Sequence, residues 1–96
     1  MNPMNLNTRE LREVCRRNDV AMLGVFGSVT RGEATKDSDV DLLVRFSRRK
    51  SLLDLVRIER EISTALGRHA DLVTEGGVSP YLRDTIKRDL RVVYEA

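Results

Sequence analysis

Short apolar segments that are typical of strands alternate along the chain with longer segments that carry an apolar stripe. Residues 20–26 (VAMLGVF) form the longest apolar run, and Gly27 ends it, as expected of a buried strand. Residues 40–46 (VDLLVRF) alternate with a period of two, which also indicates a strand. One face of that strand would carry Val40, Leu42, Val44 and Phe46, and the other Asp39, Asp41, Leu43 and Arg45. Residues 70–74 (ADLVT) predict a third strand, and residues 91–94 (RVVY) a short fourth one.

The stripes between these strands predict helices. Asn7 and Glu10 have the spacing of a capping box, so a first helix is expected to begin there and to run to about Asn18. A second helix is expected to begin at Ser51 and to end at Gly67, because a glycine commonly follows the last helical turn. The first stripe consists of Leu11, Val14 and Cys15, and the second of Leu52, Leu55, Ile58, Ile62, Ala65 and Leu66.

The remaining elements complete the predicted fold. Ser79-Pro80 begins a third helix, whose stripe is Leu82, Ile86 and Leu90. With a short helical turn after Gly27, the order of elements is αβ(α)βαβαβ. This order predicts an α/β (α+β) fold in which a small mixed β-sheet is flanked by helices. A length of 96 residues suits one domain, residues 1–96.

Composition and charge exclude several classes of protein. Charged residues make up 33% and hydrophobic residues 41%, as in a folded globular protein. The 17 Lys and Arg and 15 Asp and Glu are interleaved, so direct nucleic-acid binding through a basic face is not expected. One cysteine and one histidine exclude an internal disulfide and a Cys/His zinc cluster, and they suit the cytoplasm. No apolar run approaches the ~20 residues of a membrane span, so no membrane contact is expected.

The stretch between the first two predicted strands carries the candidate chemistry, and two motifs can be rejected there. Gly27 and Gly32 have the glycine spacing of a P-loop, but Glu33 stands where that motif needs a lysine, and it would repel phosphate. A calcium loop that began at Asp37 would need a glycine at the position of Leu42.

A third interpretation takes Gly27-Ser28 and Asp39-x-Asp41 as one unit. Alternation in a strand places both aspartates on one face, with Cβ atoms roughly 7 Å apart, and such a pair can share hard cations. Gly27 permits a tight turn, and Ser28 would begin a helical turn whose free N–H groups can hold phosphate oxygens. Together these features suit a nucleoside triphosphate and its metal ions.

This unit resembles the signature of the polymerase β-like nucleotidyltransferase superfamily. The whole chain is similar to minimal nucleotidyltransferases, the antitoxin half of HEPN–nucleotidyltransferase toxin–antitoxin pairs. The similarity extends from the GSxTRGEAxxxSDxDLLV core through ADLVT to the ending SPYLRDTIKRDLRVVYE. It implies a nucleotidyltransferase fold like the palm of polymerase β.

The resemblance also implies roles for individual residues. Gly27 and Ser28 would bind the triphosphate, and Arg31 would contact phosphate or acceptor. The implied catalytic and metal-binding carboxylates are Asp39, Asp41 and Asp71, with Asp71 either ligating metal or taking the proton of the acceptor hydroxyl. Outside this set, Cys15 is expected in the core, and His69 is expected to be structural or exposed.

The implied activity is magnesium-dependent transfer of AMP from ATP to a tyrosine hydroxyl of a cognate HEPN ribonuclease toxin, which neutralises the toxin. Two Mg²⁺ ions and ATP would be required, and the toxin would form a hetero-oligomer with this chain. Two alternatives stay open. One is an antitoxin that neutralises its partner by occlusion alone, and the other is a nucleotidyltransferase that modifies small molecules, as aminoglycoside-modifying relatives do.

Overall fold

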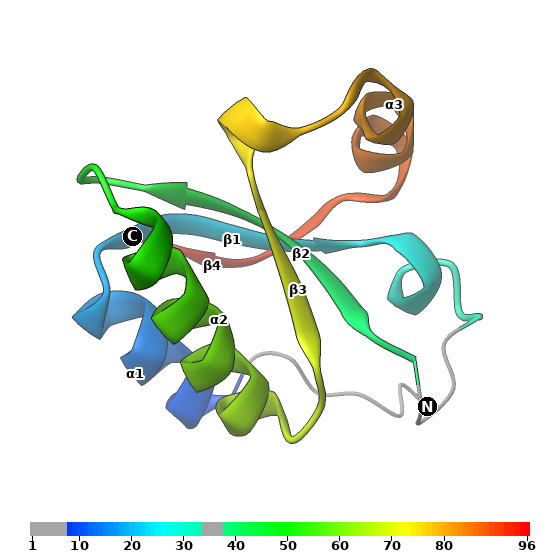
Figure 1. Ribbon diagram of the computed structural model, residues 1–96. Coiled ribbons are helices and arrows are strands. Elements are labelled where there is room, and N and C mark those ends of the chain that lie inside the picture. Colours follow the sequence, from blue (N-terminus) through cyan, green and yellow to red (C-terminus); the bar gives the residue numbers. More distant parts are fainter. Residues whose placement is uncertain (1–7, 34–37) are drawn as a thin grey trace.

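In the computed structural model, which describes residues 8–33 and 38–96, four strands form one sheet in the order β3-β2-β1-β4 (Figure 1). β1 (Val20–Phe26) pairs antiparallel with β2 (Val40–Phe46) and with β4 (Arg91–Glu95). β2 pairs in parallel with β3 (Ala70–Thr74), which forms an edge of the sheet. The sheet is therefore mixed, as predicted.

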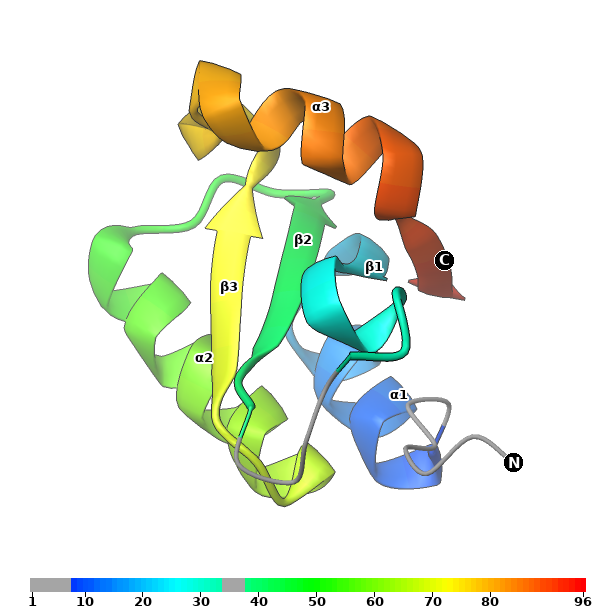
Figure 2. The same cartoon turned by 90° about the vertical axis from the view of Figure 1, so that its right-hand side faces the viewer.

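Helices cover both faces of this sheet. α1 (Arg9–Arg17) and α2 (Leu52–Leu66) lie on one face, and α3 (Pro80–Asp89) lies on the other (Figures 1 and 2). The 3-10 turns η1 (Gly27–Val29) and η2 (Glu75–Gly77) follow β1 and β3. Within the described part of the chain, no helix combines the length and the apolar character that a bilayer span requires.

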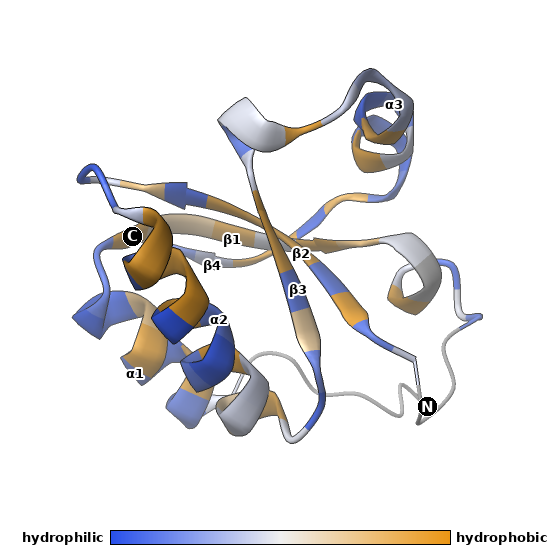
Figure 3. Cartoon of the chain, viewed as in Figure 1, coloured by the Kyte–Doolittle hydropathy of each residue, from blue (hydrophilic) through white to orange (hydrophobic). Residues whose placement is uncertain are grey.

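The two faces of the sheet are buried to different extents. The face under α1 and α2 carries the larger core, which consists of Leu11, Val14, Cys15, Val20, Leu23, Val25, Val40, Leu42, Val44, Ile58, Ile62 and Ala70. The face under α3 carries a smaller cluster of buried residues, Met22, Phe26, Leu43 and Ile86. Hydrophobic residues accordingly concentrate in the inner strands β1 and β2 (Figure 3). Because Leu43 belongs to the smaller cluster, strand alternation puts Asp41 on the α3 face.

Both ends of α2 agree with the sequence prediction, whereas the start of α1 differs from it. Ser51 and Asp54 form the reciprocal capping box of α2, with both hydrogen bonds at 3.1 Å, and Gly67 ends that helix at φ 71°. α1, however, is capped by Thr8, whose hydroxyl accepts the backbone N–H three residues on at 3.2 Å. The predicted cap at Asn7 is therefore wrong by one residue, and Asn7 itself lies outside the described residues.

The predicted apolar stripe of α2 is wrong at its first position. Ile58 and Ile62 are fully buried, whereas Leu52 is 76% exposed. At 3.6 residues per turn, Leu52 lies about 120° around the helix from Ile58, so its side chain points away from the sheet. Leu82, expected in the stripe of α3, is 37% exposed.

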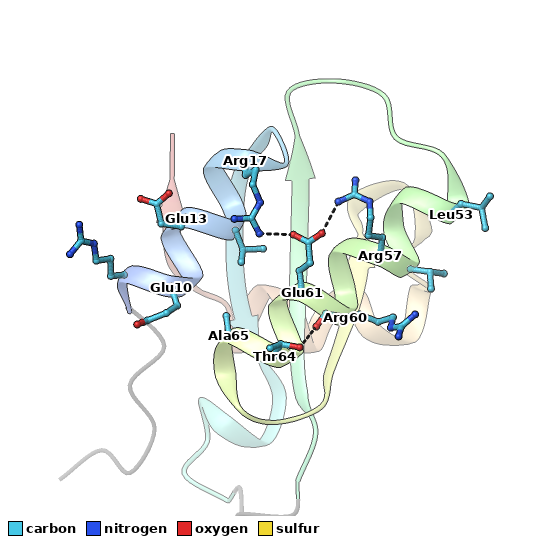
Figure 4. A pocket seen from close by; sticks show the side chains of 12 residues that line it. Glu10, Glu13, Arg17, Leu53, Arg57, Arg60, Glu61, Thr64 and Ala65 are labelled. Atoms are coloured by element: carbon cyan, nitrogen blue, oxygen red, sulfur yellow. Dashed lines mark hydrogen bonds and ion pairs between the residues drawn. The ribbon is translucent and has the colours of Figure 1, made fainter.

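Glu61 of α2 connects the two helices that cover the larger core (Figure 4). Its carboxylate accepts hydrogen bonds from Arg17 at 2.9 Å, from Asn18 at 3.1 Å and from Arg57 at 2.7 Å. The hydrogen bond from Arg17, aided by those from Asn18 and Arg57, lowers the pKa of Glu61 from 4.5 to about 2.

Loss of this carboxylate should weaken the fold in a pH-dependent way. Since the pKa of Glu61 is lower in the folded state, its stabilisation is present above pH 4.5 and is lost as the pH falls toward 2. We expect Glu61→Gln to lower the free energy of unfolding by about 1 kcal/mol at pH 7 and by clearly less near pH 2, measured by urea unfolding. Glu13→Gln, which removes an exposed ion pair with Arg16, should change little at either pH.

Candidate active site

Four potential ligands lie close together along β2 and β3 and at the starts of these strands. The parallel pairing sets Asp41 directly opposite Asp71. Asp39 and His69 lie two residues earlier in the chain, each directly before the first residue of its strand. The N–H of Val40 donates to the carbonyl of His69 at 3.0 Å. Since side chains two residues apart in a strand share a face, all four are directed to the α3 side of the sheet.

Three of these residues converge at the N-terminal ends of the two strands. Ligand atoms of Asp39, His69 and Asp71 all lie within 4.8 Å of one another. Nδ1 of His69 is 3.3 Å from Oδ1 of Asp39, and their side chains are 60% and 53% exposed. His69 is thus exposed, as expected from the sequence, but its ring belongs to the acidic cluster. The spacing His69-x-Asp71, which matches Asp39-x-Asp41, is the signal that could have indicated this.

Asp41 lies apart from that group and is half-buried. Burial raises the pKa of its carboxyl, and the charges of Asp71 and Asp39 raise it further, while Arg31 acts in the opposite direction. The carboxylates therefore repel one another, and a bound divalent cation would relieve that repulsion. Oxygen-rich, solvent-accessible donors of this kind fit Mg²⁺.

Gly27 provides the space for Asp41. It follows β1 directly and has a φ of +82°, which a residue with a side chain rarely adopts. A Cβ atom at this position would lie 2.6 Å from Oδ2 of Asp41. Ser28 is the next residue of the turn η1, and its side chain lies outside the described part of the structure.

A cavity of about 440 Å³ opens at this point between the sheet and α3. The predicted site residues Gly27, Arg31, Asp41 and Asp71 line it, together with Phe26, Leu72, Val73, Leu82 and Thr85. A larger cavity of about 930 Å³ lies between α1 and α2 on the opposite face (Figure 4). There the central carboxylate, Glu61, is already paired with Arg17 and Arg57. The smaller cavity, which carries the predicted site residues, is therefore the candidate active site.

Arg31 is anchored by a residue that the sequence analysis did not single out. Its Nη1 donates to Oδ2 of Asp89 at 2.8 Å, and its Nε donates to Glu33 at 3.0 Å. The side chain of Asp89 is only 6% exposed and also accepts from Nε of Arg88 at 3.2 Å. Asp89 thus ties Arg31, at the rim of the cavity, to the C-terminal end of α3.

Removing the charge of Asp89 should destabilise the fold. Asp89→Asn keeps the shape of the side chain but loses the charge-assisted bond to Arg31 inside a buried site. We expect the free energy of unfolding to fall by about 1.5–3 kcal/mol. Asp84→Asn, which changes an exposed aspartate of the same helix, should leave it unchanged in the same denaturation experiment. Equal stabilities for the two variants would contradict an anchoring role.

Comparison with known proteins identifies the family. Residues 8–93 match the model of the nucleotidyltransferase domain. The chain is 41% identical over 91 residues to the protein adenylyltransferase MntA of Thermococcus cleftensis, an alignment that covers 95% of this chain and 87% of that protein. The relative is thus matched over nearly its whole length.

Solved structures show the same fold. A chain of the crystal structure of a toxin–antitoxin with AMP-PNP has a TM-score of 0.79 at 20% identity, over 97% of this chain and 75% of that one. A chain of the tri-AMPylated Shewanella oneidensis HEPN toxin in complex with MNT antitoxin has a TM-score of 0.69 at 18% identity, over 95% and 71%. The predicted nucleotidyltransferase fold is confirmed. Because the family model and the Thermococcus relative both match almost the entire chain, this chain belongs to the nucleotidyltransferase-domain family, as a minimal nucleotidyltransferase of the polymerase β-like superfamily.

Proposed function

We propose that this chain transfers AMP from ATP to a tyrosine hydroxyl of a cognate HEPN ribonuclease toxin in the cytoplasm, and so neutralises the toxin. The observation that carries this proposal is the pair Asp41 and Asp71, which face each other across β2 and β3 at the wall of the 440 Å³ cavity beside Gly27. The name of the Thermococcus relative supports protein adenylylation. The similar complexes that contain AMP-PNP or a tri-AMPylated toxin support ATP as donor and a toxin as acceptor.

The acidic side chains would hold the metal, and the turn after β1 would hold the triphosphate. Asp39, Asp41 and Asp71 are the proposed ligands of two Mg²⁺ ions. When bound, Mg²⁺ neutralises charge on the triphosphate and on the departing pyrophosphate. Gly27 leaves room for the phosphates beside Asp41, and Ser28 and Arg31 would contact them.

In the transfer step, the tyrosine oxygen attacks the α-phosphorus of ATP. A bond forms between that oxygen and the α-phosphorus, the bond from the α-phosphorus to the bridging oxygen of the β-phosphate breaks, and pyrophosphate leaves. The hydroxyl proton must pass to a base, and Asp71 is proposed for this role. It is partly exposed on β3, which is an edge strand, so a tyrosine from another protein can approach it from outside the sheet.

The test combines this protein, ATP, Mg²⁺ and a candidate HEPN toxin from the same genome. We expect ribonuclease activity to be lost only when ATP is present, and to stay lost after the minimal nucleotidyltransferase is removed. Mass spectrometry should then locate AMP on a tyrosine of the toxin. If the toxin is instead neutralised without ATP and regains activity when the two proteins are separated, the result would support occlusion by binding. If aminoglycosides are added and AMP is found only on them, the result would support small-molecule transfer.

A further inference from the structure

We propose that His69 is a nitrogen ligand of the divalent-cation site, which makes the site a mixed nitrogen–oxygen centre rather than an all-carboxylate one. The inference rests on the proposed function in one respect, because the proposed function requires a divalent cation among these residues. Its basis is the convergence of ligand atoms from His69, Asp39 and Asp71, all within 4.8 Å of one another.

The backbone holds His69 in this position. The parallel register of β2 and β3, with Asp41 opposite Asp71, continues toward the N-terminal ends of the strands. There the bond from the Val40 N–H to the His69 carbonyl keeps His69 beside Asp39. An ion placed between the starts of the two strands would therefore meet an oxygen of Asp39, an oxygen of Asp71 and a nitrogen of His69.

The imidazole ring is available for coordination. It is 60% exposed, so it does not fill the core, and its Nδ1 is directed at Oδ1 of Asp39 at 3.3 Å. A cation bound between these two atoms would replace their mutual contact with two bonds to metal.

A nitrogen ligand changes which ions the site prefers. Mg²⁺ favours oxygen donors and keeps much of its water, whereas imidazole favours the later first-row ions such as Co²⁺, Ni²⁺ and Zn²⁺. With His69 as a ligand, the site should bind Co²⁺ considerably more tightly than Mg²⁺. Without His69, the preference for Co²⁺ should shrink while Mg²⁺ affinity changes little.

The experiment titrates Co²⁺ and Mg²⁺ into the untagged, metal-free full chain, without ATP or partner. His69 is the one histidine in the sequence, so a paramagnetically shifted imidazole proton signal in the Co²⁺-loaded protein can come from no other residue. We expect that signal in the native chain and its loss in His69→Gln, together with a Co²⁺ affinity about 10-fold lower or more. Circular dichroism checks that the variant is folded.

Two further variants separate the possible causes. Asp39→Asn should weaken both Co²⁺ and Mg²⁺, and Asp84→Asn, on the exposed side of α3, should weaken neither. An absent imidazole signal, or equal Co²⁺ affinity in the native chain and His69→Gln, would overturn the proposal. If the native chain gives no imidazole signal but still transfers AMP, His69 is excluded as a metal ligand and the proposed function stands. If the signal is present but no AMP is transferred, the proposed function fails and the metal ligand stands.

Discussion

Asp41→Asn is expected to reduce AMP transfer by at least ~10²–10³-fold, the cost of removing one preorganised electrostatic group from an active site. Asp41 lines the cavity and lies opposite Asp71, so its charge is proposed to act where negative charge develops on the triphosphate. Initial rates of AMP incorporation, measured with saturating ATP and Mg²⁺, would check this. Asp84→Asn serves as the control, because that aspartate is exposed on α3, and it should transfer AMP at the native rate.

The same substitution should stabilise the metal-free protein at neutral pH. Burial and the neighbouring carboxylates raise the pKa of Asp41 above 3.8 in the folded state. The folded chain therefore holds this proton more tightly than the unfolded chain, and stability is lost as the pH rises through 3.8 and then through the raised value. Thermal unfolding at pH 7 without metal should give a higher Tm for Asp41→Asn than for the native chain. A lower Tm would contradict the repulsion described here.

Gly27→Ala is the second change with a large expected effect. The added Cβ would lie 2.6 Å from Oδ2 of Asp41, so that carboxylate must move away from the cavity. A displacement of about 1 Å at a reacting group can cost ~10²-fold in rate, and we expect a loss of that size in AMP transfer. The positive φ of +82° adds strain to the backbone, which should lower the free energy of unfolding by about 1–2 kcal/mol.

Gly32→Ala separates these two effects. Gly32 has a similar φ of +72°, but no heavy atom lies within 4 Å of the position of its Cβ. This variant should show the same loss of stability with little loss of transfer. If Gly27→Ala and Gly32→Ala transferred AMP equally well, the close contact with Asp41 would have no catalytic importance.

Local patterns were sufficient to predict most of the fold. The period-two alternation of residues 40–46 was enough to predict that Asp39 and Asp41 point to the same side of the sheet. The apolar run of residues 20–26 was enough to predict the neighbouring strand and the turn at Gly27. Leu52 is apolar and was therefore assigned to the buried stripe of α2. Its angular position on the helix lies outside that stripe.

The remaining features depend on contacts between distant parts of the chain. The register that sets His69 beside Asp39 is a property of two strands about thirty positions apart, and no local periodicity contains it. Asp89 is buried because the C-terminal end of α3 meets Arg31, although its position in a polar helix segment gives it the pattern of an exposed residue. The burial of Asp89 is therefore evident only in three dimensions, and so is the closeness of His69 to Asp39, for which the spacing His69-x-Asp71 is the one local signal.

The most direct test of nucleotidyl transfer compares ATP labelled at the α-phosphate with ATP labelled at the γ-phosphate. Each would be incubated with Mg²⁺, the native chain and the candidate HEPN protein, and in a parallel reaction Asp41→Asn would replace the native chain. We expect the α-label on the HEPN protein and the γ-label in free pyrophosphate, with both products formed far more slowly by Asp41→Asn. A γ-label on the HEPN protein, or no transfer of either label in a stable complex, would contradict nucleotidyl transfer at this site.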